Sequence, residues 1–137
     1  MSVAYVASNA ILNLLFGATA MSTNPGTFYM GLSTTTILAD GSGATEPTGG
    51  AYARVALTNN KTTFSVSTVG TLTNLITISF AESTLSWGTI TYVFLASAGT
   101  TGVNDIWYFE ALPTPKAVAS QTTVSFSPSA MTVSLTN

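Results

Sequence analysis

The chain contains no cysteine and no histidine, and it has few charged residues of either sign. It therefore lacks the usual zinc ligands and any nucleophile–base pair built on cysteine or histidine. The missing cysteines also mean that no disulfide pattern indicates a redox compartment. Lys and Arg number 3 and Asp and Glu number 5, which gives a net charge of −2. So few cations cannot form a phosphate-binding stripe, and the composition argues against nucleic-acid binding.

Low charge does not indicate disorder here, because 46% of the residues are hydrophobic and only 6% are charged. Disordered chains combine low hydrophobicity with high charge. The 137 residues suit one domain spanning the whole chain, 1–137. A weakly charged surface favours self-association, so the composition is typical of an assembly subunit.

Long hydrophobic runs are also missing. No stretch approaches the roughly 20 apolar residues that a transmembrane helix needs, so we expect no membrane partner. Residues 18–20 resemble a signal-peptidase site, but the segment before them has no positive charge. Asn9 and Asn13 also interrupt its apolar run. Both features disfavour a secretory signal.

Residues 2–16 are predicted to form an N-terminal helix, with Ser2 as N-cap and Gly17 just past the end. Apolar residues recur there at three- and four-residue spacing: Val3, Val6, Ala7, Ala10, Ile11, Leu14 and Leu15. The apolar face either packs on the chain's own sheet or docks into a partner subunit.

Downstream of residue 27 the chain consists of short alternating segments separated by turns. The expected strands are 27–32, 52–57, one through Phe64 and Val66, 75–80, 89–96, 106–109, 122–126 and 131–135. Segments 89–96 and 106–109 are apolar on both faces and should be covered on both sides. Pro113 and Pro115 are expected to break the sheet. The predicted fold is mainly β, an antiparallel β-sandwich or jelly-roll-like domain with one N-terminal α-helix.

The alternation also predicts one shared core. Its expected members are Val55, Leu57, Ile76, Ile78, Phe80, Phe94, Tyr108, Phe126, Val133 and Leu135. Trp87 and Trp107 are expected core aromatics.

Residues 33–50 form the longest stretch without periodicity, which is typical of a binding loop or an interface arm. The loop leads into a strand that carries the only arginine, Arg54. Arg54 is expected either to pair with Glu46 or Glu82, or to anchor a neighbouring subunit. The candidate interface residues are Asp40, Glu46, Pro47, Tyr52 and Arg54.

No residue pattern indicates catalysis, a metal or a cofactor. The carboxylates Asp40, Glu46, Glu82, Asp105 and Glu110 lie in or near turns, without the paired arrangement of a glycosidase. Residues 40–43 faintly resemble a calcium loop but lack its further acidic ligands. Residues 99–102 lack the lysine and spacing of a phosphate loop. We therefore expect no enzymatic activity.

Several motifs together resemble a family of small tailed-bacteriophage structural proteins, often labelled tail fibre proteins. They are Thr-Phe-Tyr-Met-Gly-Leu-Ser-Thr-Thr at 27–35, Glu-Pro-Thr-Gly-Gly at 46–50, Tyr-Ala-Arg-Val at 52–55, Ser-Trp-Gly-Thr-Ile-Thr at 86–91, and Leu-Pro-Thr-Pro-Lys-Ala-Val at 112–118. The resemblance runs in order along nearly the whole chain. It implies a virion protein made in the host cytoplasm, and it carries over no catalytic residue.

The resemblance favours a capsid decoration or cement protein, expected to be a trimer that clamps the major capsid protein by multivalent contacts. The alternative is a tail-fibre, baseplate or neck component. A third possible function is that of a carbohydrate-binding module, which exposed aromatic side chains beside a pair of carboxylates would indicate.

Overall fold

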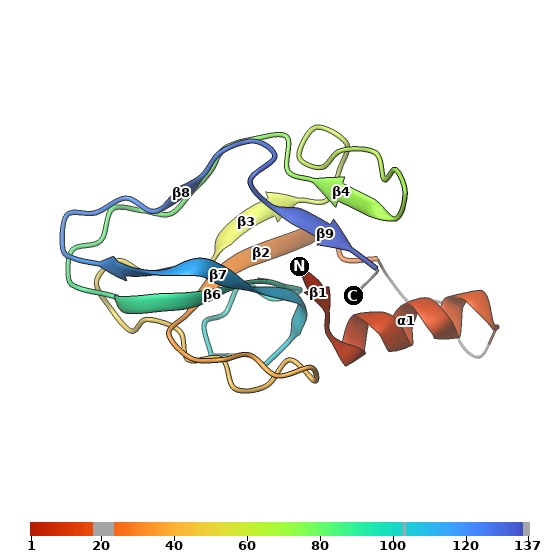
Figure 1. Ribbon diagram of the computed structural model, residues 1–137, viewed down its shortest axis with the longest axis horizontal. Helices are drawn as coiled ribbons and strands as arrows, with labels where there is room; N and C mark the ends of the chain where they lie inside the picture. The colour runs from red at the N-terminus through yellow and green to blue at the C-terminus, as the bar shows by residue number, and fades with distance from the viewer. Residues whose placement is uncertain (18–23, 103, 136–137) are drawn as a thin grey trace.

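A computed structural model describes residues 1–17, 24–102 and 104–135, and its largest sheet is antiparallel with five strands (Figure 1). In spatial order these strands are β1 (Ser2–Val3), β7 (Ile106–Val118), β6 (Gly88–Ala96), β2 (Thr27–Ser33) and β3 (Val55–Thr58). Neighbouring strands in sequence are often not neighbours in space, so the sheet depends on long-range pairing.

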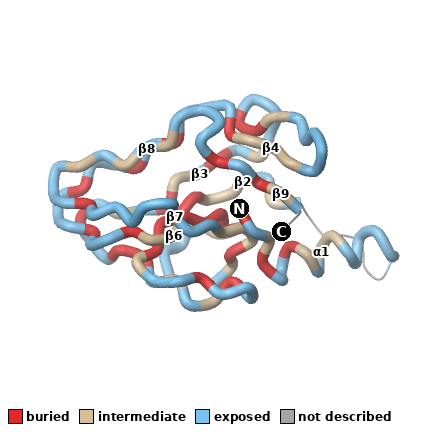
Figure 2. The backbone as a smooth tube through the Cα atoms, viewed as in Figure 1, coloured by how far each residue is buried: buried red, intermediate tan, exposed pale blue. Residues whose placement is uncertain are grey.

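Two small sheets lie over one face of this large sheet. One pairs β4 (Thr71–Thr73) with β9 (Thr132–Ser134), and the other pairs β5 (Ile78–Ser79) with β8 (Ser125–Phe126). A buried apolar cluster joins the layers. Figure 2 shows buried stretches, in red, on strands of both layers. The largest members of the cluster include Met30, Leu32, Leu57, Phe64, Ile78, Phe80, Trp87, Ile90 and Leu95. The described part of the chain is thus mainly β, with antiparallel layers and one helix, as the sequence predicts.

Strand β6 is covered on both faces, as its doubly apolar pattern predicts. Val93 and Leu95 belong to the cluster between the layers, while Phe94 and Ala96 belong to a second buried cluster with Ile37. Successive side chains of a strand point to opposite faces, so the two clusters lie on opposite sides of β6. The loop that carries Ile37 covers the second face.

Prolines do not break the sheet, which corrects the sequence prediction. Strand β7 runs continuously through Pro113 and Pro115. Its pairing with β6 changes register there, because Tyr92 lies opposite Ala111 whereas Ile90 lies opposite Lys116. The prolines lie in the extra residues of this irregularity, where no ladder hydrogen bond is required of them.

The predicted core is confirmed in part. Four of its members are buried between the layers: Leu57, Ile78, Phe80 and Val133. Three more pack against that cluster from partly buried positions: Val55, Tyr108 and Phe126. Trp87 is buried as predicted, and Trp107 is half-buried.

Three members of the predicted core lie elsewhere. Phe94 belongs to the second cluster, while Ile76 and Leu135 are 41% and 56% exposed. The regular strand around Ile76 begins only at Ile78, so the alternation does not extend back to it. The expected strand through Phe64 and Val66 is also wrong, because Phe64 makes only an isolated bridge and Val66 is exposed.

The N-terminal helix α1 (Tyr5–Leu15) is shorter than predicted. Ser2 does not cap it, because Ser2 and Val3 form β1 and pair with Phe109 and Tyr108 on β7. The backbone N–H and C=O groups at the β7 edge form hydrogen bonds with this segment. These bonds stabilise the segment as a strand by more than a side-chain cap, worth about 1 kcal/mol, would stabilise it as a helix start. Gly17 lies just past the helix end with φ +70°, as predicted.

Candidate functional site

The carboxylates do not gather into an open site. Glu46 is buried and Asp105 partly so, both against Arg54, whereas Asp40, Glu82 and Glu110 are exposed. Within residues 1–17, 24–102 and 104–135, no group of three or more potential metal ligands comes together.

Arg54 is the centre of a buried polar network. Its side chain is 1% exposed and pairs with Glu46 at 2.8 Å through Nη2 and with Asp105 at 2.9 Å through Nη1. Nη1 also donates to the carbonyl of Ala98 at 2.7 Å. The guanidinium lies 5.0 Å from the centre of the Phe94 ring, in cation–π geometry. One side chain thereby joins segments far apart in the sequence.

Glu46 extends this network on the opposite side. Its carboxylate accepts a hydrogen bond from the Tyr52 hydroxyl at 2.8 Å and from the Gly102 N–H at 2.7 Å. The Tyr52 oxygen in turn accepts from the Leu32 N–H at 2.9 Å. Among the described residues, no buried side-chain nitrogen or oxygen is left without a partner. A fully satisfied network of this kind stabilises one arrangement of the loops it connects.

The contacts of Arg54 and Tyr52 shift the pKa values of both side chains. Burial lowers the pKa of Arg54, but its hydrogen bonds to Glu46 and Asp105 outweigh burial and hold the pKa above its ordinary value. Burial raises the pKa of the Tyr52 phenol, and the neighbouring Glu46 charge raises it further. Both groups are therefore held in their ordinary protonation states and are not poised for proton transfer near neutral pH.

The long loop is fixed to its own chain. The Thr34 N–H donates to the Thr45 carbonyl at 2.9 Å, and the Leu38 N–H donates to the Ser42 carbonyl at 2.8 Å. Gly43 has φ +85°, and a Cβ there would lie 2.7 Å from the Thr36 carbonyl oxygen. The loop folds back on itself and covers the second apolar cluster.

The structure brings four of the five candidate interface residues into or beside this network. Glu46, Pro47 and Arg54 are buried by the chain's own residues, and Tyr52 is half-buried. Asp40 is fully exposed, and hydrogen bonds from the Ser42 hydroxyl and N–H lower the pKa of its carboxyl. Pairing of Arg54 with Glu46 is confirmed; the interface role of the five residues stays a prediction.

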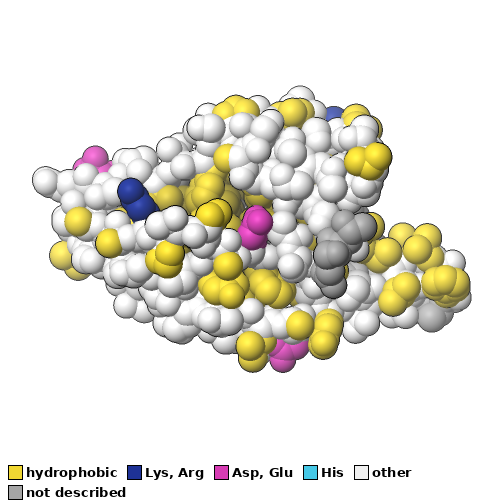
Figure 3. Space-filling model, in the orientation of Figure 1, with side chains coloured by type: hydrophobic (Ala, Val, Ile, Leu, Met, Phe, Trp, Pro, Cys, Tyr) yellow, Lys and Arg dark blue, Asp and Glu magenta, His cyan; other side chains and the backbone are white. Residues whose placement is uncertain are grey.

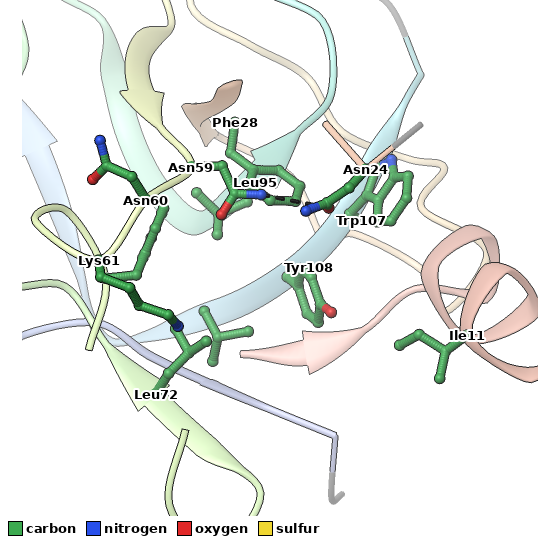
Figure 4. Close-up of a pocket in the computed structure, with 12 residues that line it drawn as sticks. Ile11, Asn24, Phe28, Asn59, Asn60, Lys61, Leu72, Leu95, Trp107 and Tyr108 are labelled. Carbon is green, nitrogen blue, oxygen red and sulfur yellow. Dashed lines mark hydrogen bonds between the residues drawn. The ribbon is translucent and has the colours of Figure 1, made fainter. Parts of the chain in front are cut away.

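A second feature is an apolar groove between the large sheet and the β4–β9 sheet (Figure 4). Its cavity has a volume of about 590 Å³. Apolar side chains from both layers line it: Phe28, Phe64, Leu72, Leu95, Trp107 and Tyr108. Phe28 and Trp107 meet edge to face, with ring centres 5.9 Å apart. Ile11 of α1 lies at one end.

Several polar groups at the groove rim have partners within the chain. The Asn59 amide donates to the Pro25 carbonyl at 2.8 Å. The Asn60 side-chain oxygen accepts from the N–H and the hydroxyl of Thr62 at 3.0 and 2.7 Å. The Lys61 ammonium donates to a backbone carbonyl 3.3 Å away. The surface that remains for an occupant is therefore mainly apolar.

Helix α1 projects from the body beside this groove (Figure 1). It is attached at its start, where the Ala4 N–H donates to the Trp107 carbonyl at 2.8 Å and the Tyr5 N–H to the Ala39 carbonyl at 3.0 Å. Ala7 is its one buried residue. Its end exposes Leu12, Leu14, Leu15 and Phe16, the last at 81%. Figure 3 shows the hydrophobic side chains gathered over this projection.

Sequence reasoning found Arg54 and Glu46 but missed Asp105 as their partner and missed the groove altogether. Asp105 lies 51 residues from Arg54 along the chain, and nothing in the local pattern of either residue connects them. The groove is lined by residues from opposite layers, so only the packing of the layers creates it. The available signal was the doubly apolar 106–109 segment, which indicated that something covers Trp107 and Tyr108.

No described helix has both the length and the apolar character needed to cross a membrane. Comparison with curated proteins finds no match. A family model described as "podophage GP4 fiber I protein gp80" matches residues 2–134, almost the full length of the chain. The chain therefore belongs to the podophage GP4 fiber I protein gp80 family and is a structural protein of a phage virion.

Proposed function

We propose that this protein is a non-enzymatic subunit of a podophage fibre, attached to its neighbours through helix α1. The observation that carries the proposal is the exposure of an uncharged helix that leaves the body with its apolar side chains in solvent. An exposed apolar surface of this extent is typical of an interaction site. The family description supports a fibre in preference to a capsid decoration protein, the reading that the sequence favoured.

The rest of the fold supports a rigid connecting role. The long loop is fastened by its own hydrogen bonds and by the Arg54 network, so it stays with its own body. Helix α1 is then the element best suited to reach a neighbour. The low charge of the chain fits a protein whose surface is covered by others, and we propose that it works as a homo-oligomer, a trimer.

Position and copy number in the phage particle test this proposal. An antibody or gold label against this chain should mark the fibres, and quantitative mass spectrometry of virions should find at most a few dozen copies. Labelling over the head, with hundreds of copies, would contradict the fibre assignment and restore the decoration protein.

The role of α1 is tested by replacing Leu12 and Leu15 with glutamine, which keeps good helix propensity. This double variant should fold but be lost from particles. Leu85→Gln is the matched control, because Leu85 is 63% exposed on the body and Leu15 is 69% exposed on the helix. Normal incorporation of the α1 variant would contradict the attachment role.

The absence of enzymatic turnover is a further part of the proposal. It is supported by the pairing of Glu46 and Asp105 with Arg54, because a carboxylate held in an ion pair is not free to act as a general acid or base. Glycan hydrolysis by the purified protein, abolished by Glu82→Gln or Glu110→Gln, would overturn it.

A further inference from the structure

Apolar side chains are exposed on one face of α1, with Ser8 and Asn9 between Tyr5 and the apolar end of the helix. Leu12, Leu15 and Phe16 follow the i, i+3, i+4 spacing of an anchor face, and Tyr5 lies two turns earlier on the same side. These four side chains are 52%, 69%, 81% and 60% exposed. Together they leave roughly 500 Å² in solvent, about as much as the largest patch of a typical monomer.

The groove and the helix match in chemistry. The groove is walled by aromatic and aliphatic side chains, and the Asn59 amide and the Asn60 side-chain oxygen at its rim form hydrogen bonds within the chain. A sugar would need free donors and acceptors there, whereas an apolar helix needs none. A cavity of about 590 Å³ lies within the range of roughly 300–1,000 Å³ that is typical of pockets that take a ligand.

The charges match as well. The charged side chain that lines the groove is the cation Lys61, and no side chain before Asp40 in the sequence is charged. Helix α1 has no basic residue in its last turn, so its carbonyl end carries an uncompensated partial negative charge. Lys61 at the rim is suited to the C-terminal end of an incoming helix.

We propose that the groove of one copy holds the α1 helix of a second copy. This inference rests on the proposed role of α1 as the attachment element and names its partner. The groove has room for the apolar side chains at the end of such a helix, because its volume of about 590 Å³ exceeds that of a leucine and a phenylalanine side chain together. Because helix and groove are different surfaces, the contact is head to tail, and it gives a ring such as the expected trimer where the rotation between copies closes.

Two full-length variants separate the two halves of the contact. The arm variant, Leu15→Gln with Phe16→Gln, damages the helix and leaves the groove intact. The groove variant, Asn24→Trp with Lys61→Glu, fills and recharges the exposed rim and leaves the helix intact. Sedimentation velocity should show self-association of the wild type, weakened roughly ten- to a hundredfold in each variant alone.

Mixing the variants gives the sharpest result. The groove variant supplies a sound helix and the arm variant a sound groove, so an equimolar mixture should form heterodimers and stop there. Circular dichroism and thermal unfolding of each variant check that both remain folded. No heterodimer from two folded variants, or wild-type association that both variants retain, would overturn the proposal.

The absence of native cysteine allows a direct proximity test. A Leu15→Cys chain mixed with a Lys61→Cys chain should form a mixed disulfide, because helix end and groove rim meet across the contact. The yield should exceed by about tenfold that of Leu15→Cys mixed with Leu85→Cys, since proximity raises the effective thiol concentration. Equal yields would contradict the proposed docking.

The outcome also distinguishes this inference from the proposed function. If the wild type stays monomeric at every concentration but α1 variants are still lost from virions, the helix binds another virion protein. Self-docking is then wrong and the attachment role stands. If α1 variants enter fibres normally, or if the protein is absent from fibres, the proposed function itself fails.

Discussion

Replacing Arg54 with methionine tests whether the buried network stabilises the fold. The substitution keeps much of the unbranched side chain but removes the guanidinium that pairs with Glu46 at 2.8 Å and Asp105 at 2.9 Å. The Glu46 carboxylate then remains 4% exposed with no cation beside it. Its remaining donors are the Tyr52 hydroxyl and the Gly102 N–H, which cannot neutralise the charge.

The expected loss follows from the burial. Removing one partner of a buried ion pair costs about 3–5 kcal/mol, because the other charge stays buried and unpaired. For a chain of this length that corresponds to a fall in Tm of roughly 10–20 °C. The carbonyl of Ala98 and the Phe94 ring also lose their contacts with the guanidinium, so the upper part of this range is expected.

The assay is urea unfolding followed by tryptophan fluorescence, applied to Arg54→Met, Glu46→Gln and the double variant. The two single losses should be coupled, so the double variant should be more stable than their sum predicts, by about 0.5–3 kcal/mol. Lys116→Met is the matched control, because Lys116 is exposed and its loss should stay within about 0.5 kcal/mol.

Hydrogen exchange adds a local readout. The Gly102 amide donates to Glu46, so its protection should fall in Glu46→Gln before global unfolding does. The reasoning would be refuted if Arg54→Met lowered the free energy of unfolding by less than about 1 kcal/mol, or by no more than Lys116→Met does. Water would then solvate the Glu46 carboxylate in the variant.

Three further predictions concern the core and pH. Phe80→Ala should lower the free energy of unfolding by about 3–5 kcal/mol, since Phe80 is 3% exposed; a loss below about 1 kcal/mol in urea unfolding would contradict its core position. Gly31→Ala should cost about 1–3 kcal/mol in the same assay, because a Cβ there would lie 2.1 Å from the buried Phe94 ring; wild-type stability would show that the ring moves freely. Burial raises the pKa of Tyr52 in the folded state, so its contribution is complete below the unfolded pKa of about 10 and is lost as pH rises above it. Unfolding free energies at pH 8 and pH 11 should therefore differ more for the wild type than for Tyr52→Phe, and equal slopes would exclude this role.

The sequence pattern correctly predicted those features of the fold that a few adjacent residues specify. The doubly apolar 89–96 segment correctly indicated a strand covered on both faces, and Gly17 correctly marked the helix end. The position of Glu46 near the only arginine correctly raised an ion pair as one outcome. In each case a few adjacent residues carry the signal, because strand alternation, helix ends and short loops are local properties.

Predictions from the sequence pattern were wrong where pairing with a distant segment decides the structure of the residues. Ser2 and Val3 have the composition of a helix start, but the edge of β7 at Tyr108 and Phe109 pairs with them. Pro113 and Pro115 suggested a break, but β6 and β7 shift register around them and keep the strand. Ile76 continues an apolar alternation, yet the paired strand begins only at Ile78.

By itself the sequence determined the mainly β class, the single helix near the N-terminus, the doubly covered strand and the lack of Cys or His chemistry. Only the tertiary structure decided that Asp105 joins Arg54 and Glu46, that the long loop is fastened to its own body, and that α1 projects beside an apolar groove. Periodicity reports which face of a segment is buried, but it carries no information about what buries it. Asp105 reaches Arg54 from 51 residues away, and the walls of the groove come from strands far apart in the chain, so both exist only once the chain has folded.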